Sequence, residues 1–406
     1  MNLFFELVRF ELKKMMCRKR TVIVLTLVII ISALSVFRTV IGTYYYTNEN
    51  GSEIAVSRYD EDMIDRKYGE ALSGRVIDAD LIMEAVEAYK RVPLESGNYT
   101  GTSEYQNIAR KYSEIYGIVR RVFHLSGVEE FQSLTRGQAE QFDAVRRQNM
   151  EQAIRNSVAG ENVHNALQKY LNDAPAALTY EYHGGYYRFV TIMYTTAIMA
   201  AAAIAIIISG LFSDEYTSGA DSLILSSRHG RGLVIGAKLF MAFSVSAVLI
   251  TLLSAISLIE SFIIWGTNGA DAALELMAIF PYPITIGQSA LLYFICVLTA
   301  CIMFAAITAL FSAKLKLPFN TIIIMTALLI VPMFIGVPDE APIWVFCLEN
   351  LLPANMLAFW GAMYEYQYEI FGLVIPPYIF LPIFALIVTC VCSYFACRGF
   401  KSHQIN

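Results

Sequence analysis

Few side chains in this sequence have the types and spacing that catalysis requires. The stretch closest to a phosphate-binding loop runs from Gly232 to Lys238, but its glycine spacing is wrong and Leu239 stands where a serine or threonine would hold Mg²⁺. The histidines are scattered without metal-ligand spacing: His124, His164, His183, His229 and His403. We therefore predict no catalytic residue, no metal site and no cofactor in this chain.

The most informative polar segment is the loop 213–232. Ser218 and Asp221 have the spacing of a helix capping box, which predicts a short helix starting near Gly219. That helix would present three apolar side chains to water: Leu223, Ile224 and Leu225. A basic turn follows them: Arg228, His229 and Arg231. Either the loop docks on a partner, or it is an ordinary charged hairpin that fixes the orientation of its neighbours.

The elements around this loop are those of a membrane protein. The 406 residues are 56% apolar and only 16% charged, with a mean hydropathy of +0.50, which is too apolar for a soluble chain. A helix needs about 20 apolar residues to cross a bilayer. Six blocks are long enough: Thr21 to Ile41, Phe189 to Phe212, Leu233 to Trp265, Ile286 to Ser312, Phe319 to Gly336 and Val374 to Cys397.

Lys and Arg occur beside only one set of the short connections between these blocks, and this predicts the orientation. They precede the first block, join the second to the third and the fourth to the fifth, and follow the sixth: Lys13, Lys14, Arg18, Lys19, Arg20, Arg228, Arg231, Lys238, Lys314, Lys316, Arg398 and Lys401. Cytoplasmic loops retain positive charge. We therefore expect both termini in the cytoplasm, which an even number of spans allows.

The segment 47–185, between the first two blocks, is expected to form a mostly helical domain outside the cell. Long loops cross a membrane largely regardless of their charge, and none of the seven cysteines lies in this segment to staple it. Three stretches predict amphipathic helices: Ala79 to Val92, Ser103 to Leu125 and Gly137 to Val158. Aromatic rings at the two ends suit the headgroup level of one membrane face: Tyr44, Tyr45, Tyr186 and Tyr187.

Residues 1–20 are expected to form an amphipathic helix on the inner leaflet, ahead of a first span within 21–46. On a helical wheel the apolar residues share one arc: Phe4, Phe5, Leu7, Val8, Leu12, Met15 and Met16. Charged residues lie opposite, and Phe10 and Glu11 interrupt the pattern. The alternative is that the apolar arc packs on protein instead of lipid.

Together these features resemble the permease subunits of ABC transporters of the type-two exporter class. Those permeases have a cytoplasmic amphipathic helix, six spans and an inner loop patterned Glu, Gly, Leu-Leu, Arg, Lys. The loop here has residues in that order: Glu215, Gly219, Leu223, Leu225, Arg228 and Lys238. The resemblance implies that this loop, including Asp221 and Arg231, is a coupling helix that docks on a separate ATPase subunit, which binds ATP and Mg²⁺.

The resemblance also implies short re-entrant helices on the outer side between the fifth and sixth spans, in the segment 337–373. The stretch from Ala341 to Tyr368 matches in position and aromatic content, with Trp344, Pro353 and Trp360. A domain of the size of 47–185 matches only those subfamilies that carry one after the first span. The region 186–406 would then hold the remaining five spans.

We therefore expect an all-α integral membrane protein of a bacterial plasma membrane, the permease subunit of an exporter that moves a peptide, drug, lipid or ion outward. Its expected partners are ATPase subunits, a second permease chain in a homo- or heterodimer, and lipid, but no nucleic acid. The alternative is a signalling protein in which ATP binding inside moves the outer domain to control a partner. A secondary transporter would need inverted repeats and a carboxylate at mid-membrane, and we find neither in the sequence.

Overall fold

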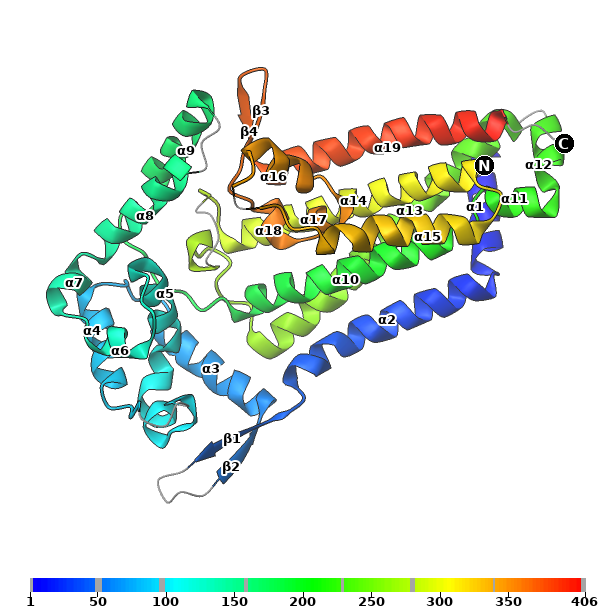
Figure 1. Cartoon of the computed structure of the whole chain (residues 1–406). Helices are drawn as coiled ribbons and strands as arrows, with labels where there is room; N and C mark the ends of the chain where they lie inside the picture. Colours follow the sequence, from blue (N-terminus) through cyan, green and yellow to red (C-terminus); the bar gives the residue numbers. More distant parts are fainter. Residues whose placement is uncertain are drawn as a thin grey trace.

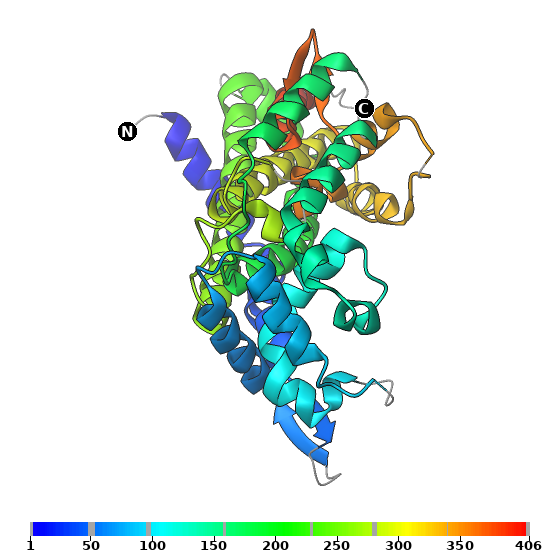
Figure 2. The same ribbon diagram turned by 90° about the vertical axis from the view of Figure 1, so that its left-hand side faces the viewer.

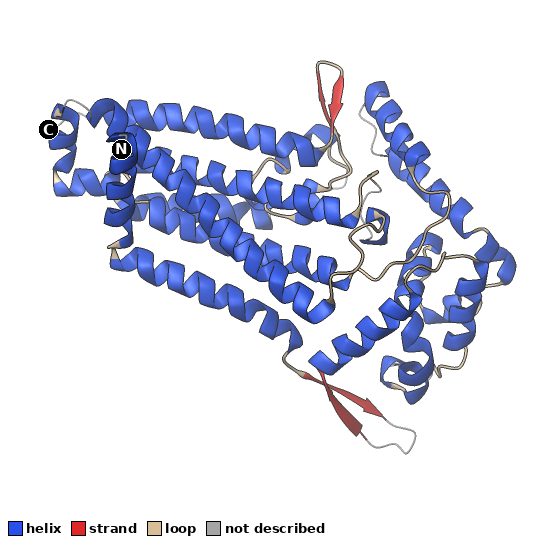
Figure 3. Cartoon of the chain, turned by 180° about the vertical axis from the view of Figure 1, so that it is seen from behind, coloured by secondary structure: helices blue, strands red, loops and turns tan. Residues whose placement is uncertain are grey.

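The computed structural model describes residues 3–47, 53–94, 99–156, 160–227, 230–277, 282–338 and 340–402. These residues form long helices, a series of shorter ones and two antiparallel hairpins (Figure 3). Five of the described helices are long and apolar enough to cross a membrane. The chain therefore has the character of a multi-pass helical membrane protein.

The long helices form a bundle (Figure 1). They are α2 (Lys19–Val40), α10 (Gly184–Ile208), α13 (Ile235–Trp265), α14 (Ile286–Lys314) and α19 (Pro377–Lys401). Each helix runs opposite to the one before it, except that α19 runs parallel to α14 because the shorter α15 (Pro318–Ile330) lies between them. The helix α1 (Leu3–Met16) lies across one end of the bundle, which we call the α1 end, and the segment 47–185, which we call the insert, lies at the other, the insert end. Both α1 and the last turn of α19 are at the α1 end.

Two of the six predicted blocks differ in the structure. The fifth forms a shorter helix, α15 (Pro318–Ile330) of 13 residues, extended by the 3-10 turn η6 (Val331–Phe334). The sixth begins at Pro377 because Val374 belongs to a β-strand. The physical reason is the Pro376-Pro377 pair, since a residue before proline favours an extended backbone and proline is well placed in the first turn of a helix.

The insert begins with a hairpin and continues as a string of helices. The strands β1 (Thr43–Thr47) and β2 (Glu53–Ser57) precede α3 (Arg58–Leu72), α4 (Ala79–Tyr89), α5 (Ser113–Phe123), α6 (Val128–Gln132), α7 (Arg136–Glu140), α8 (Phe142–Asn156) and α9 (Glu161–Asp173). The stretch predicted as one helix over 103–125 is interrupted by a π-helical turn, Tyr105–Ala109, and a 3-10 turn, Arg110–Tyr112. At this break buried Arg110 reaches α3, 2.7 Å from Asp65 and 2.9 Å from the carbonyl of Glu61.

The insert covers the insert end of the bundle (Figure 2) and is attached there at several points. On one side α3 meets α10 and α13, where Arg188 lies 3.4 Å from Asp62 and Arg66 donates to the carbonyl of Ile264 over 3.2 Å. On the other side Arg146 of α8 lies 2.6 Å from Glu275, in the 3-10 turn η5 (Leu274–Met277). Burial raises the pKa of the Glu275 carboxyl, and Arg146 acts in the opposite direction.

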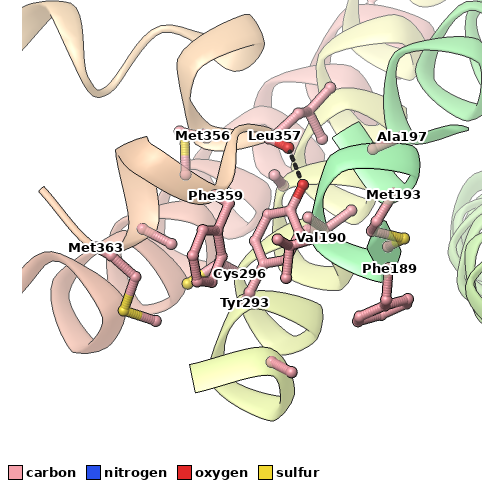
Figure 4. Close-up of a cluster of buried hydrophobic side chains, with 14 of the residues drawn as sticks. Phe189, Val190, Met193, Ala197, Tyr293, Cys296, Met356, Leu357, Phe359 and Met363 are labelled. Carbon is pink, nitrogen blue, oxygen red and sulfur yellow. Dashed lines mark hydrogen bonds between the residues drawn. The ribbon is translucent and has the colours of Figure 1, made fainter. Parts of the chain in front are cut away.

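Three short helices follow α15 and remain at the insert end: α16 (Ile343–Glu349), α17 (Pro353–Met356) and α18 (Phe359–Ala362). Figure 4 shows how α17 and α18 pack on α14 and α10, with Tyr293 donating a 2.8 Å hydrogen bond to the carbonyl of Leu357 and stacking edge-on with Phe359. The hairpin of β3 (Tyr368–Ile370) and β4 (Leu373–Ile375) then leads into α19.

Candidate functional site

The predicted loop forms a helix-turn-helix unit at the α1 end. The helix α11 (Ser213–Ser218) follows α10, and α12 (Ala220–Ser226) follows α11 after Gly219. The hydroxyl oxygen of Ser312 in α14 accepts hydrogen bonds from the backbone N–H groups of Phe212 (3.0 Å) and Ser213 (3.2 Å). Tyr216 donates to the carbonyl of Ala313 over 2.8 Å. The start of α11 is therefore fixed to the end of α14.

Gly219 makes the turn between the two short helices. Its φ is +68°, a left-handed conformation that glycine adopts without steric cost. Ser218 is the last residue of α11 and donates its hydroxyl to the carbonyl of Asp214, so it does not cap α12. The predicted capping box of Ser218 and Asp221 is therefore wrong, because Gly219 occupies the capping position and no side chain caps α12.

The surface of α12 presents one leucine. The side chain of Leu223 is 74% exposed, whereas Leu225 is 7% exposed and Asp221 is 6% exposed. The two buried residues are four positions apart and therefore share the inner face of the helix. The expectation that Leu225 is presented to water with Leu223 is wrong, and Leu223 is the exposed apolar contact.

A buried charge cluster lies beneath α11. The ammonium group of Lys238 in α13 is 2.6 Å from Glu215 and 2.8 Å from Glu11 of α1, and Lys14 of α1 is also 2.6 Å from Glu215. The side chains of Lys238 and Glu215 are each 1% exposed. Two carboxylates and two ammonium groups balance, which offsets the cost of removing them from water. The cluster joins α1, α11 and α13.

A second set of ion pairs joins α11 to the α1–α2 elbow. Asp214 pairs with Arg18 and with Arg20, the latter at 2.7 Å, and all three side chains are partly exposed. Gly210 makes room for this contact, since a Cβ atom there would lie 1.9 Å from the guanidinium of Arg20 and 2.3 Å from Asp214. The turn between α1 and α2 is therefore fixed to the turn between α10 and α11.

The helix α1 packs on α13 instead of lying wholly on lipid. Phe4 contacts Phe240 edge-on, Val8 is partly buried, and Glu11 points inward to the charge cluster. Phe5 and Leu12 remain 57% and 39% exposed along one edge. Glu11, which interrupts the apolar arc in the sequence, is thus one of the residues that fasten the helix.

The structure describes only some of the basic residues of the loop. Arg228 and His229 lie outside the described residues, as does the side chain of Arg231. Lys238 lies inside α13 as a member of the charge cluster. The π-helical turn η4 (Gly230–Val234) comes directly before α13. A Cβ atom on Gly230 would lie 1.6 Å from the carbonyl oxygen of Ile224.

The remaining predicted site residues lie at the insert end. Tyr44 and Tyr45 are exposed on β1, Tyr187 is half-exposed, and Tyr186 packs edge-on against Phe262. In the short helices Pro353 is buried, Trp344 is exposed, and Trp360 contacts Tyr194 of α10 although it is 55% exposed.

A cavity of about 870 Å³ opens at the insert end, between residues 173–181 on one side and residues 267–275 and 282–288 on the other. Four carboxylate residues are among its lining: Asp173, Glu181, Asp271 and Glu275. Among the described residues of the chain, no group of three His, Cys, Asp or Glu side chains gathers closely enough to hold a metal ion.

No protein-family model, no curated protein and no solved structure matches this chain. The fold and the site are those of a helical, multi-pass membrane protein with a helix-turn-helix unit fixed at one end and a helical insert at the other.

Proposed function

We propose that this chain is the permease subunit of an ATP-binding-cassette exporter of the type-two class, and that α11 and α12 form its coupling unit. The observation that carries the proposal is Leu223, an exposed leucine on α12, which directly follows α11, and α11 is fixed to α1, α13 and α14. An apolar side chain in this position suits a groove on a partner. That partner is a separate ATPase subunit, which binds ATP and Mg²⁺.

The proposed topology puts the α1 end in the cytoplasm and the insert outside. Lys314, Lys316 and Arg398 join the basic residues around α1 at the same end of the bundle, as cytoplasmic ends require. The fifth of the six proposed spans is the segment of α15 and η6. It measures about 25 Å at 1.5 Å per residue, so it crosses with local thinning of the bilayer. The short helices α16 to α18 dip into the outer leaflet.

Force from the ATPase would enter through α12 and divide at α11. One branch passes through Glu215 to Lys238 and α13, and the other through Asp214 to the elbow before α2. The buried contact of Glu215 with Lys238 moves as a unit, because breaking a buried pair costs several kcal/mol, whereas the partly exposed pairs of Asp214 form the weaker connection. Closure of two ATPase subunits would thus turn the spans of two permease chains about a central path.

The proposal is tested by co-expressing the chain with its candidate ATPase. Leu223→Asp should abolish co-purification and substrate-stimulated hydrolysis, whereas Leu223→Met should retain both. The matched control is Leu317→Asp, because Leu317 is 52% exposed near the same end but lies outside α12. Transport that continues without any ATPase would contradict the assignment.

A signalling role is the second candidate, and the attachment of the insert favours it. Because α3 is bound to α10 and α13 through Arg188 and Arg66, movement of these helices would move the insert. Deleting residues 48–183 separates the two roles. Export that survives the deletion supports transport, while loss of a partner's activation with no export in either form supports signalling.

A further inference from the structure

The hairpin of β3 and β4 ends in an unusual turn. Phe371 has a φ of +51° and Gly372 a φ of +80°, and the side chain of Phe371 is fully exposed. A left-handed backbone is uncommon for a bulky residue, and asparagine or aspartate is the usual choice before glycine in such a turn. A strained, fully exposed aromatic residue therefore calls for a role.

The two faces of the hairpin contact different parts of the molecule. Glu369 and Val374 lie opposite each other and face the insert, where Asn162 donates to Glu369 over 2.8 Å and Val374 packs on the apolar cluster of α8 and α9. Alternation along a strand puts Tyr368 on the other face, where it stacks on Phe380 of α19 with ring centroids 4.0 Å apart.

The end of this second face is apolar and uncovered. Ile370 and Leu373 are paired there and are 38% and 69% exposed, and Phe371 lies beside them in the turn. We call these three residues the hairpin tip. The nearest charged side chain in the hairpin, Glu369, is on the opposite face and occupied by Asn162.

The position of the tip matches the boundary of a bilayer. The first residue of α19 comes two positions after β4, and α19 carries exposed Ile379 and Ile383 on its outer flank. Its 25 residues span about 37 Å, which exceeds a hydrocarbon core of about 30 Å, so its first turns reach the interface. The hairpin projects sideways from that end of the bundle (Figures 1 and 3).

We propose that the hairpin tip inserts into the headgroup region of the leaflet at the insert end and so anchors α9 to the membrane. The tip lies on the hairpin face that stacks on α19 through Tyr368, and the charged Glu369 lies on the opposite face, toward the insert. Lipid is therefore the occupant that fits. The proposal needs only a membrane-spanning bundle and does not depend on a partner ATPase.

The test uses the full chain in lipid nanodiscs with tryptophan introduced by Phe371→Trp. The fluorescence added to that of the wild type should be blue-shifted and quenched by phosphatidylcholine brominated near the headgroup, and less by lipid brominated near the methyl end. The control Lys90→Trp, at an exposed position on the insert, should escape both. Emission quenched by aqueous iodide alone would overturn the proposal. Blue-shifted emission that resists both quenchers would overturn it in favour of a protein occupant.

Anchoring of α9 has its own readout. Phe371→Asp should raise amide hydrogen exchange in Glu161–Asp173 in nanodiscs by several-fold, whereas Phe371→Leu should leave it unchanged. Equal exchange in both variants counts against the anchor, and the quenching experiment decides insertion even where the aspartate variant folds poorly.

Discussion

The ammonium group of Lys238 lies between two carboxylates, 2.6 Å from Glu215 and 2.8 Å from Glu11, with its side chain 1% exposed. Charges this far from water are tolerated only as a balanced set. Removing the central cation leaves two buried carboxylates with only one ammonium group, Lys14, which contacts Glu215. A substitution of Lys238 therefore leaves a buried charge without a partner.

Lys238→Met should lower the stability of the folded chain by about 3–5 kcal/mol, because it leaves both carboxylates without their shared partner. Thermal unfolding in detergent measures the loss. The control Lys316→Met removes an exposed lysine at the same end and should have little effect. Adding Glu11→Gln to Lys238→Met should recover part of the loss, and no recovery would show that the carboxylates are not coupled.

The left-handed turn at Gly219 supplies a second test. Gly219→Ala should cost about 1–2 kcal/mol, since a Cβ atom opposes the φ of +68° although no neighbour obstructs it. Gly219→Asn should cost less. Amide exchange in α12 reports the loosening, and Gly232→Ala, where the space is open and φ is not positive, should leave exchange unchanged. Equal effects from the two alanine variants would contradict this account.

Sequence patterns located the loop but not its contacts. The turn at Gly219 and the exposure of Leu223 follow from local sequence spacing, since both depend on residues within one helical turn. The pairing of Glu11 with Lys238 does not, because the two residues are 227 positions apart and meet only when α1 packs on α13. In the amphipathic pattern Glu11 was an interruption, and a charged residue within an apolar arc is the one signal that could have marked it.

Among the elements, the contact of α8 with η5 includes a buried carboxyl whose protonation affects its stability. Burial raises the pKa of Glu275, and the guanidinium of Arg146 opposes that rise. Arg146 also donates to the carbonyl of Pro175 over 2.8 Å, so it connects three segments of the insert end. Removing Arg146 takes away the cation that favours the ionised form of Glu275, while the Glu275 carboxyl stays buried.

Arg146→Met should therefore raise the pKa of Glu275 further and make the folded state bind a proton that the unfolded state releases. Stability is then retained below the ordinary carboxyl pKa and is lost as pH rises through the raised folded value. Thermal unfolding from mildly acidic to neutral pH tests the sign. The double variant with Glu275→Gln should lose this added pH dependence, and a variant that gains stability with rising pH would contradict it.

Long, uniformly apolar elements were predictable and interrupted ones were not. The blocks that became α10, α13 and α14 were located closely because about 20 apolar residues in lipid have only the helix available. The stretch 103–125 has helical composition throughout, yet the contact of Arg110 with α3 accompanies a π-helical and a 3-10 turn. The hairpin β3–β4 was not predicted, because the apolar residues from Val374 onward indicate the start of a membrane-spanning helix.

On the scale of the whole molecule, the two ends of the bundle have opposite character. The α1 end carries the basic residues and the charge cluster, and the insert end carries the insert and the acidic-lined cavity. This asymmetry distinguishes the two ends, and both α1 and the last turn of α19 lie at the α1 end. It makes the orientation of the chain directly testable.

An impermeant maleimide should label the native, exposed Cys17 only in inside-out vesicles, and should label Lys90→Cys on the insert in intact cells. The reason is that opposite ends of the bundle face opposite compartments. A Cys17→Ser variant controls for other cysteines. Labelling of Cys17 from outside would reverse the topology and remove α12 from the reach of a cytoplasmic ATPase.

The helix α2 is held by charged contacts at its two ends, and along its length it packs on α10 and α13 through one flank that includes buried Val28 and Val36. Arg18 and Arg20 hold its beginning to Asp214, and the α3 helix that follows it is held to the bundle by Arg188 and Arg66, while another flank between them exposes apolar side chains to lipid. Such a helix can transmit an axial displacement from one end of the bundle to the other. A push on α11 would travel along its axis and reach the insert without first repacking the bundle.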